Sequence, residues 1–205
     1  MEIKERIQQK AEDLFRRFGI RSVTMDEIAN QLGISKKTIY LYYADKDEIV
    51  DAVISNIINE NQTCCNKDRS IATDAIHEIF LAMEMIQEML QDMNPSIMYD
   101  LERSHPKAFQ KFIHHKYKYL YEVMKENIER GIKEDLYRPE VQADVVAKMR
   151  LETMMLAFNQ DIFPKTKYKL TDVEQQLIEF YLYGLASSKG RKLIAKYQAI
   201  RKKEK

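Results

Sequence analysis

The 205-residue sequence contains no tryptophan, only five glycines and only four prolines. Glycine and proline are the residues that interrupt helices, and they are scarce here, while lysine, glutamate, leucine, isoleucine and methionine are abundant. No segment shows the alternation of apolar and polar residues that a half-buried strand requires. Composition and periodicity together predict a soluble, all-α protein.

The sequence also lacks the signals of a membrane or secreted protein. It has no run of eighteen apolar residues, about the minimum for a membrane-spanning helix. The first six residues, MEIKER, are mostly charged and no apolar stretch follows them, so we expect no secretory signal. Cys64 and Cys65 are adjacent and give no disulfide framework. These absences favour a cytoplasmic location.

The formal net charge of +1 hides an uneven distribution of charge. Residues 1–47 carry nine Lys/Arg and eight Asp/Glu, residues 48–187 carry sixteen and twenty-three, and residues 188–205 carry eight and one. An acidic middle repels nucleic acid, so any contact with DNA must come from an end of the chain. The basic tail alone is weak support, because solvated lysine-rich termini are common.

Apolar residues recur at helical spacing along almost the whole chain. Glycines, prolines and capping residues divide this pattern into separate helices. Thr24–Glu27 and Thr171–Glu174 have the form of capping boxes, in which a hydroxyl and a carboxylate three residues later cap the first turn. The expected helices cover residues 3–18, 24–31, 35–42, 45–64, 70–92, 95–103, 106–133, 139–158, 171–187 and from 191 onward.

The segment TMDEIANQLGISKKTIYLYYADK, from Thr24 to Lys46, has the pattern of a helix-turn-helix. Ala29 is small where the second helix passes closest, and Gly33 occupies the turn, where a positive φ is needed. Four apolar side chains fall where the two helices bury their shared core: Ile28, Leu32, Ile34 and Ile39. Because all these requirements are met within twelve residues, the signal is specific.

The second helix of this motif carries polar groups on its outer face. Its first turn is Ser35, Lys36, Lys37 and Thr38, and Tyr40 follows on the same side. No acidic residue occurs from Ile28 to Ala44. A recognition helix enters the major groove with its N-terminus first, so these side chains would meet base edges and phosphates. Lys36 and Lys37 taken alone would be read as a solvated face; within this motif they favour DNA contact.

Two further phosphate contacts are expected from the starts of other helices. The helix that begins at Thr24 exposes backbone N–H groups and a hydroxyl, and Lys46 places an ammonium group at the start of the fourth helix.

Residues 7–53 resemble the DNA-binding region of the tetracycline-repressor (TetR) family. The resemblance rests on T-x-x-x-I-A-x-x-L-G-I-S-K-x-T-I-Y from Thr24, followed by a tyrosine and by Lys-x-x-Ile from Lys46. It implies an obligate homodimer, a palindromic double-stranded DNA operator and a C-terminal helical domain that binds an inducer. Leu41 departs from many relatives, which makes a base contact there doubtful, and Tyr43 matches a position that packs against the first helix. The residues implied to face DNA are Thr24, Lys36, Lys37, Thr38, Tyr40, Tyr42 and Lys46.

We therefore divide the chain into a helix-turn-helix DNA-binding domain, residues 1–47, and a helical ligand-sensing and dimerisation domain, residues 48–205. A dimer places two recognition helices about one turn of DNA apart, roughly 34–36 Å. The last two long helices, near 140–158 and 171–187, are apolar on more than one side, which favours a four-helix dimer bundle. Gly184 would let the helices approach closely.

The middle helices combine methionine and tyrosine, a combination that suits an adaptable pocket for a small-molecule effector. The candidate lining residues are Met83, Tyr99, Tyr117, Tyr121 and Met124, although a methionine stripe at helical spacing is more often plain core. Arg150 and Glu152 are charges within an apolar helix. We expect an exposed face for them, with a buried ionic or ligand contact as the alternative.

No catalytic or metal-binding constellation emerges. His114 and His115 are adjacent, hence about 100° apart on a helix, and cannot chelate one metal together. His77 and His105 have no neighbouring ligand at metal-binding spacing. Because a phosphate-binding glycine loop and a nucleophile elbow are also missing, we expect no enzyme activity, no metal and no cofactor. We read Cys64–Cys65 as incidental rather than as a redox sensor.

The preferred hypothesis is a homodimeric, ligand-responsive repressor. A ligand-independent architectural DNA-binding protein of the same fold is the alternative, and a solidly packed C-terminal half would favour it. A third hypothesis, a helical enzyme with an accessory helix-turn-helix, would need a convergent cluster of acid, base or metal groups. The sequence does not reveal the effector or the operator.

Overall fold

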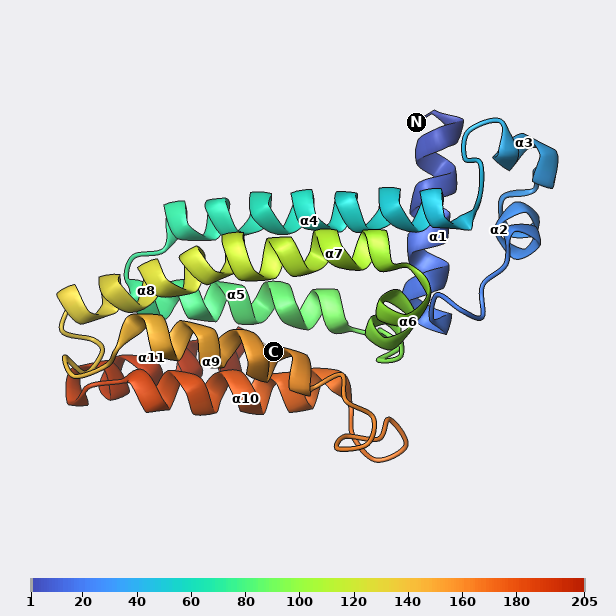
Figure 1. The fold of residues 1–205 in the computed structure, drawn as a ribbon. Coiled ribbons are helices and arrows are strands. Elements are labelled where there is room, and N and C mark those ends of the chain that lie inside the picture. The colour runs from blue at the N-terminus through green and yellow to red at the C-terminus, as the bar shows by residue number, and fades with distance from the viewer. Residues whose placement is uncertain (1, 205) are drawn as a thin grey trace. The chain divides into compact units, whose positions relative to one another are not determined.

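The computed structural model describes residues 2–204, and helices make up most of that range (Figure 1). Within it the only β-type pairing is an isolated bridge between Tyr137 and Ala186, so the all-α prediction is confirmed. None of these helices is both long and apolar enough to cross a membrane. The helices are α1 (Ile3–Phe18), α2 (Met25–Leu32), α3 (Lys36–Tyr40), α4 (Lys46–Ile71), α5 (Ala75–Leu90), α6 (Ile97–Ser104), α7 (Pro106–His114), the π-helix η1 (His115–Leu120), α8 (Tyr121–Lys133), α9 (Ala143–Leu156), α10 (Leu170–Leu185) and α11 (Ser188–Glu204).

Several helix boundaries differ from the sequence-based expectation. The helix expected from residue 139 begins only at Ala143. α4 continues to Ile71, past the predicted end near Cys64. α5 begins only at Ala75, because the Asp74 carboxylate caps it by accepting hydrogen bonds from the backbone N–H groups of Ile76 and His77. The helix predicted over 106–133 is interrupted by the π-helical turn η1, a local widening of the helix that apolar periodicity does not report.

The chain forms two compact units. The N-terminal unit consists of the residues up to Asn61 together with Asp92–His115, and the C-terminal unit consists of Gln62–Gln91 together with the residues from Lys116 onward. α4 contributes its first half to one unit and its second half to the other. The predicted division at residues 47 and 48 concerns function, and it stays a prediction.

The N-terminal unit is built around the apolar face of α1. α1 lies across the first half of α4 (Figure 1), and the Gln8 side-chain amide donates to the Ala52 carbonyl oxygen. The segment 92–115 is tied to α1 by a hydrogen bond from the Asn94 N–H to the Arg16 carbonyl oxygen, 2.7 Å. The buried core of this unit includes Ile7, Ala11, Leu14, Phe15, Ile20, Ile28, Ile39, Tyr43, Ile49 and Val50.

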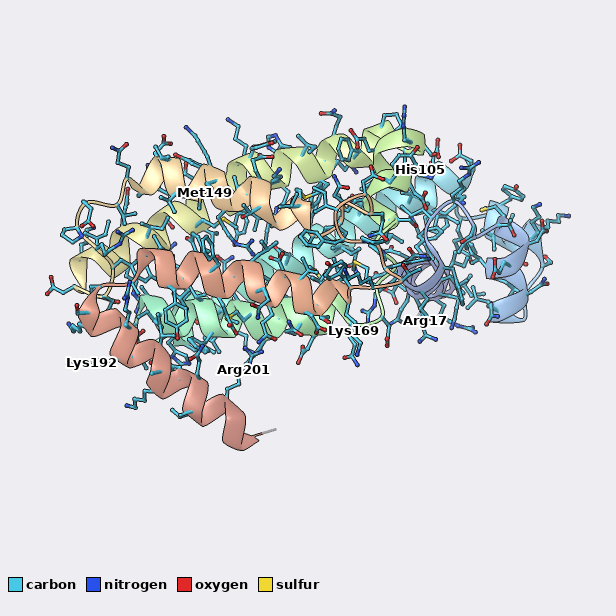
Figure 2. The ribbon with its side chains drawn as sticks, turned by 90° about the horizontal axis from the view of Figure 1, so that it is seen from below. Arg17, His105, Met149, Lys169, Lys192 and Arg201 are labelled. Atoms are coloured by element: carbon cyan, nitrogen blue, oxygen red, sulfur yellow. The ribbon has the colours of Figure 1, made fainter. Side chains whose placement is uncertain are left out.

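The C-terminal unit is a bundle in which α8 packs on α9, α10 packs on α5 and α9, and α5 also contacts α8 and α11. α11 runs at an angle to α10 and carries the basic residues Lys192 and Arg201 (Figure 2). The apolar core of the bundle contains Ala75, Ile76, Phe80, Ile128, Leu136, Tyr137, Ala147, Tyr181, Leu182, Leu185, Ala186 and Ile194.

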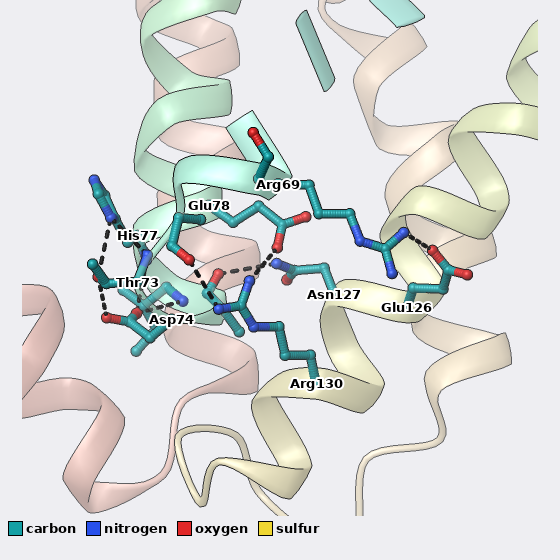
Figure 3. Close-up of polar contacts among 12 residues, drawn as sticks. Arg69, Thr73, Asp74, His77, Glu78, Glu126, Asn127 and Arg130 are labelled. Atoms are coloured by element: carbon teal, nitrogen blue, oxygen red, sulfur yellow. Dashed lines mark hydrogen bonds and ion pairs between the residues drawn. The ribbon is translucent and has the colours of Figure 1, made fainter. Parts of the chain in front are cut away.

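A buried polar cluster fixes the start of α5 to α8 (Figure 3). The Asn127 side-chain amide and the Tyr137 hydroxyl both donate to the carbonyl oxygen of Ala75, at 3.0 and 3.2 Å. Arg130 adds hydrogen bonds to the carboxylates of Glu78 and Glu134. Burial raises the pKa of Tyr137 well above its usual range, so this hydroxyl acts as a permanent donor.

Two expectations about charged residues in this unit are wrong. Thr171–Glu174 is not a capping box: α10 starts one residue earlier, at Leu170, and Glu174 is buried. Arg150, expected on an exposed face, is also buried, and its guanidinium pairs with the Glu174 carboxylate. Glu152 is exposed as expected. The carboxylate of Glu174 therefore compensates a buried cation instead of capping a helix.

The contact between Gly131 and Tyr137 gives a stability test. A Cβ at residue 131 would lie 2.1 Å from the Tyr137 ring, so Gly131→Ala must displace a fully buried ring. We expect this substitution to lower the free energy of unfolding by about 1–3 kcal/mol, as overpacking does. Urea denaturation followed by circular dichroism measures it. Lys133→Ala, at an exposed position of the same helix, is the control and should change stability by less than about 0.5 kcal/mol. Equal effects of the two substitutions would contradict this packing.

Candidate nucleic-acid interface

A left-handed residue forms the corner between α2 and α3. Gly33 has φ +66° and ψ 30°, and its N–H ends α2 by donating to the carbonyl oxygens of Ala29 and Asn30. The Ile34 N–H then donates to the Ala29 carbonyl oxygen, 3.1 Å, which closes the turn. Such backbone geometry strains residues that carry a Cβ, so glycine at this position is explained by the turn itself.

The inner faces of α2 and α3 meet in an apolar contact. Ile28, Ala29 and Ile39 are buried, as the sequence pattern predicts. Leu32 and Ile34, expected in the same core, are only half-buried. Because Ile39 faces inward, the rest of the short helix α3 is left facing outward.

The first turn of α3 is ordered by its own side chains. The Ser35 hydroxyl accepts a hydrogen bond from the Thr38 N–H, 3.1 Å, and lies 2.8 Å from the Thr38 hydroxyl. At the start of α2, the Thr24 hydroxyl accepts in the same way from the Glu27 N–H, 3.1 Å. Ser35, Lys36 and Lys37 are exposed, and Thr38 is half-buried. The predicted cap residues therefore hold two helix starts at the surface.

The two lysines of α3 differ in their partners. The Lys36 ammonium lies 2.8 Å from the Asp26 carboxylate on α2, and this hydrogen bond raises the pKa of Lys36. Lys37 is exposed and makes no ion pair within residues 2–204. Of the two, Lys37 therefore has its ammonium available without breaking an existing bond.

Three consecutive large side chains, Tyr40, Leu41 and Tyr42, are exposed at the end of α3. Leu41 is 74% exposed, more than either tyrosine. Sequence reasoning made a base contact at Leu41 doubtful, since its residue type departs from the family pattern. The exposure of Leu41 could have been predicted from its position between two outward-facing tyrosines.

Lys46 is less accessible than its expected role in phosphate contact suggests. Its side chain is half-buried, and its ammonium donates to the carbonyl oxygens of Ile20 and Val23 at 2.6 and 2.5 Å. Burial lowers the pKa of Lys46, and the nearby Asp100 carboxylate opposes that effect. The main role that this geometry gives Lys46 is to hold the start of α4 against the loop before α2. Phosphate contact through its remaining N–H stays a prediction.

Tyr43 packs against α1, as the sequence comparison predicts. Its ring is buried, and its hydroxyl donates to the Lys4 carbonyl oxygen, 3.5 Å. The Lys4 ammonium lies 5.6 Å from the centre of the ring. Burial raises the pKa of Tyr43. This side chain therefore fixes α1 to the end of the helix-turn-helix and does not belong to the exposed surface.

The five predicted effector residues are divided between the two units. Tyr99 belongs to the N-terminal unit, where it is exposed beside Arg103, and the other four belong to the C-terminal unit. Met83 is buried, and Met124 packs against the core of the bundle.

The two remaining candidates are bound to carboxylates. Tyr117 donates to Glu152 and Tyr121 to Asp144, each at 2.6 Å. The second bond raises the pKa of Tyr121 to about 12. An effector role for these residues remains a prediction.

The N-terminal unit contains a pocket of about 230 Å³ beside the start of α4. His105, buried between α6 and α7, contacts the Asp47 carboxylate through Nδ1 at 2.6 Å. None of the predicted effector residues lines this pocket. Its lining consists of Asp45, Asp47, Glu48, Asp51, His105, Pro106, Lys107 and Ala108. Within residues 2–204 no three His, Cys, Asp or Glu side chains are grouped to hold a metal ion.

Comparison with known families agrees with the geometry of this surface. Residues 7–53 match the family described as bacterial regulatory proteins, tetR family, and the match includes the whole of α2 and α3. The N-terminal region of the chain, residues 7–53, is therefore a DNA-binding region of the TetR type. The chain is 30% identical over 92 residues to the HTH-type transcriptional regulator YvaF of Bacillus subtilis (strain 168). That alignment covers 43% of this chain and 47% of the relative, so it spans about half the length of the relative.

Solved structures share the fold of this chain at low sequence identity. A transcriptional regulator from Saccharomonospora viridis in complex with choline is 18% identical, with a TM-score of 0.71 over 90% of this chain and 97% of the other. FadR from Bacillus subtilis in complex with stearoyl-CoA is 17% identical, with a TM-score of 0.67 over 88% of this chain and 98% of the other. These likenesses extend the shared fold from the DNA-binding region to most of the chain.

The corner at Gly33 can be tested apart from side-chain packing. A Cβ at this position would meet nothing within 4 Å, so Gly33→Ala should cost only backbone strain, about 1–2 kcal/mol of unfolding free energy. Gly33→Asn should cost less, because asparagine tolerates the left-handed region better. Thermal and urea denaturation of both variants measure the difference. If alanine and asparagine are both neutral, the left-handed corner is wrong.

Proposed function

We propose that this chain is a homodimeric, ligand-responsive repressor of the TetR family that binds a palindromic operator through its N-terminal unit. The observation that supports the proposal most directly is the exposed first turn of α3 beyond the left-handed corner at Gly33. That turn presents a helix N-terminus, two hydroxyls and an ammonium without an ion pair, all of which suit the major groove of DNA.

In the proposed complex the exposed groups contact different parts of the DNA. Lys37 contacts phosphate or the guanine edge, and Ser35 and Thr38 contact phosphate or bases. Lys36 joins them when it exchanges Asp26 for the DNA backbone. Thr24 at the start of α2, together with Tyr40 and Tyr42, holds the flanking phosphates, and Leu41 offers an apolar contact to a thymine methyl group. Lys46 mainly positions the motif.

Exposed apolar side chains on α9 and α10 support the dimer. Val145 and Met149 on α9 are exposed, and Phe180 on α10 is 82% exposed. Large apolar side chains clustered on neighbouring helices are typical of an interface, and the commonest interface in homo-oligomers is a twofold one. A Cβ at Gly184 would meet nothing within 4 Å, so that part of α10 is open to a close partner.

Ligand control is proposed for the C-terminal unit. Two proteins of the same fold have solved structures in complex with choline and with stearoyl-CoA, which supports an effector for this chain without identifying it. An effector acts here by binding one arrangement of the bundle more tightly than another, and it shifts the equilibrium only by that difference in affinity. The similarity to the transcriptional regulator YvaF also supports a regulator rather than an enzyme.

The DNA contacts are tested by alanine variants of α3. Lys37→Ala and Tyr40→Ala should each weaken operator binding by about tenfold, the size expected for loss of one charge-assisted contact. Lys37→Ala should also reduce the slope of log affinity against log salt by about one. Gel-shift titration at several salt concentrations measures both effects.

Lys107→Ala is the control for these variants, since Lys107 is an exposed lysine of the same unit that lies outside α3. It should leave affinity and salt slope unchanged. Wild-type affinity in both α3 variants would contradict the proposed interface.

The dimer is tested on α10. Phe180→Glu should convert the dimer to monomer in sedimentation equilibrium and lower operator affinity, because a carboxylate cannot be buried unpaired in an apolar interface. Ile200→Glu is the matched control, since it places the same charge at an exposed apolar position on α11. If Phe180→Glu remains dimeric, or if Ile200→Glu alone dissociates the dimer, α10 is not the interface.

A further inference from the structure

Three polar side chains lie deep inside the C-terminal unit, on the helices α9 and α10. Arg150, Glu174 and Tyr181 are only 4%, 3% and 5% exposed. Glu174, Ile178 and Tyr181 follow one face of α10, since positions four and seven residues after Glu174 return to the same side of a helix. The Arg150 guanidinium reaches this face from α9, 5.9 Å from the centre of the Tyr181 ring.

Each of these side chains keeps one polar atom without a partner. The Arg150 Nη2 atom donates to Glu174 Oε1. Arg150 Nη1, Glu174 Oε2 and the Tyr181 hydroxyl are buried and have no hydrogen-bond partner among residues 2–201, whose side chains the structure describes. Buried polar groups in native proteins are almost always hydrogen-bonded, and leaving one unpaired destabilises the fold. Three such atoms around one ion pair point to a partner from outside the chain.

The charges of the pair restrict what that partner is. Arg150 and Glu174 compensate each other, so the site has no net charge when both are ionised. A carboxylate or ammonium bound here would add a buried charge without a counter-charge, which is strongly unfavourable. An uncharged group that both accepts and donates hydrogen bonds satisfies Arg150 Nη1 and Glu174 Oε2 and leaves the charges balanced.

The surroundings of the pair are apolar and adaptable. The Tyr181 ring belongs to the core of the bundle together with Phe80 and Ile128. Met154, one turn beyond Arg150 on α9, is half-buried, and methionine side chains re-pack with little loss of energy. The molecule that reaches the pair is therefore apolar apart from its polar group.

We infer that the effector site of this protein is centred on Arg150, Glu174 and Tyr181, and that it binds an uncharged small molecule with an apolar body and an amide or hydroxyl head. The head accepts from Arg150 Nη1 and donates to Glu174 Oε2. The inference rests on the proposed ligand-responsive function and gives that function a site and a chemical class. None of the five sequence-predicted effector residues belongs to this trio.

The inference is tested with probes that differ only in charge. We would measure the Tm of the purified full-length protein with straight-chain primary amides of four to ten carbons, and with the carboxylates and ammonium salts of the same lengths. The amides should raise the Tm in a concentration-dependent way and bind at least about tenfold more tightly than either charged series.

Two variants assign any binding to the buried pair. Glu174→Gln keeps the shape of the side chain but removes its negative charge, so Arg150 is left unbalanced and the preference should reverse in favour of the carboxylates. The double variant Arg150→Met, Glu174→Leu replaces the pair by apolar residues of similar volume, a change that proteins tolerate. In this variant the three probe series should differ by less than about twofold, as expected once the hydrogen bonds to the head group are gone.

Several results would overturn the inference. If no probe changes the Tm, the site does not bind uncharged molecules of this class and the inference is wrong. If Glu174→Gln keeps the wild-type preference, the probes bind elsewhere. Gel shifts on the same samples separate this failure from failure of the repressor proposal. If the wild-type protein shows no preference for amides but Lys37→Ala still weakens DNA binding, only the effector site is rejected. If the wild-type protein prefers amides but does not bind DNA, the repressor proposal is rejected.

Discussion

The corner between α2 and α3 depends on one left-handed residue and one apolar contact. Gly33 ends α2 and turns the chain toward α3, and Ile39 then packs inward with Ile28 and Ala29. With Ile39 fixed on the inner side, Lys36, Lys37 and Tyr40 are exposed and Thr38 is half-buried. The polar first turn of α3 is therefore exposed by the packing itself, and the Ser35 cap keeps it helical without help from DNA.

The rest of the N-terminal unit holds this corner in place. Lys46 connects the start of α4 to the loop before α2, and Tyr43 connects the end of the motif to α1. Asp100 accepts a hydrogen bond from the Arg21 N–H, 3.0 Å, so α6 is tied to the same loop. A side chain that the sequence assigns to DNA contact can thus serve mainly to stabilise the N-terminal unit. Lys46 is the clearest case, because two of its three N–H groups are already used.

Local patterns of residues were sufficient to predict the helices, the helix-turn-helix and its outward-facing residues, since caps, a left-handed turn and a buried face are each set by residues close in sequence. Contacts between distant residues were not predictable in this way. Thr171–Glu174 has the form of a capping box, but the charge of Arg150, twenty-four residues before Glu174, draws that carboxylate into the core. The π-helical turn at His115–Leu120 is likewise not indicated by the local pattern of residues.

The proposed function and the inferred effector site meet on the same two helices. α9 and α10 carry the buried pair on their inner side and exposed apolar residues on their outer side. A molecule that binds the pair would therefore act on helices that the proposed dimer also uses, which is a short physical route from effector to dimer geometry.

The central claim is that the exposed turn of α3 reads DNA as one half of a symmetric pair. Selection of bound sequences from random double-stranded DNA tests it most directly. The account predicts an inverted repeat with half-sites whose centres are about 10 base pairs, one helical turn, or a multiple of that apart. Recovery of no enriched sequence, or of a single half-site without its inverted copy, would contradict it.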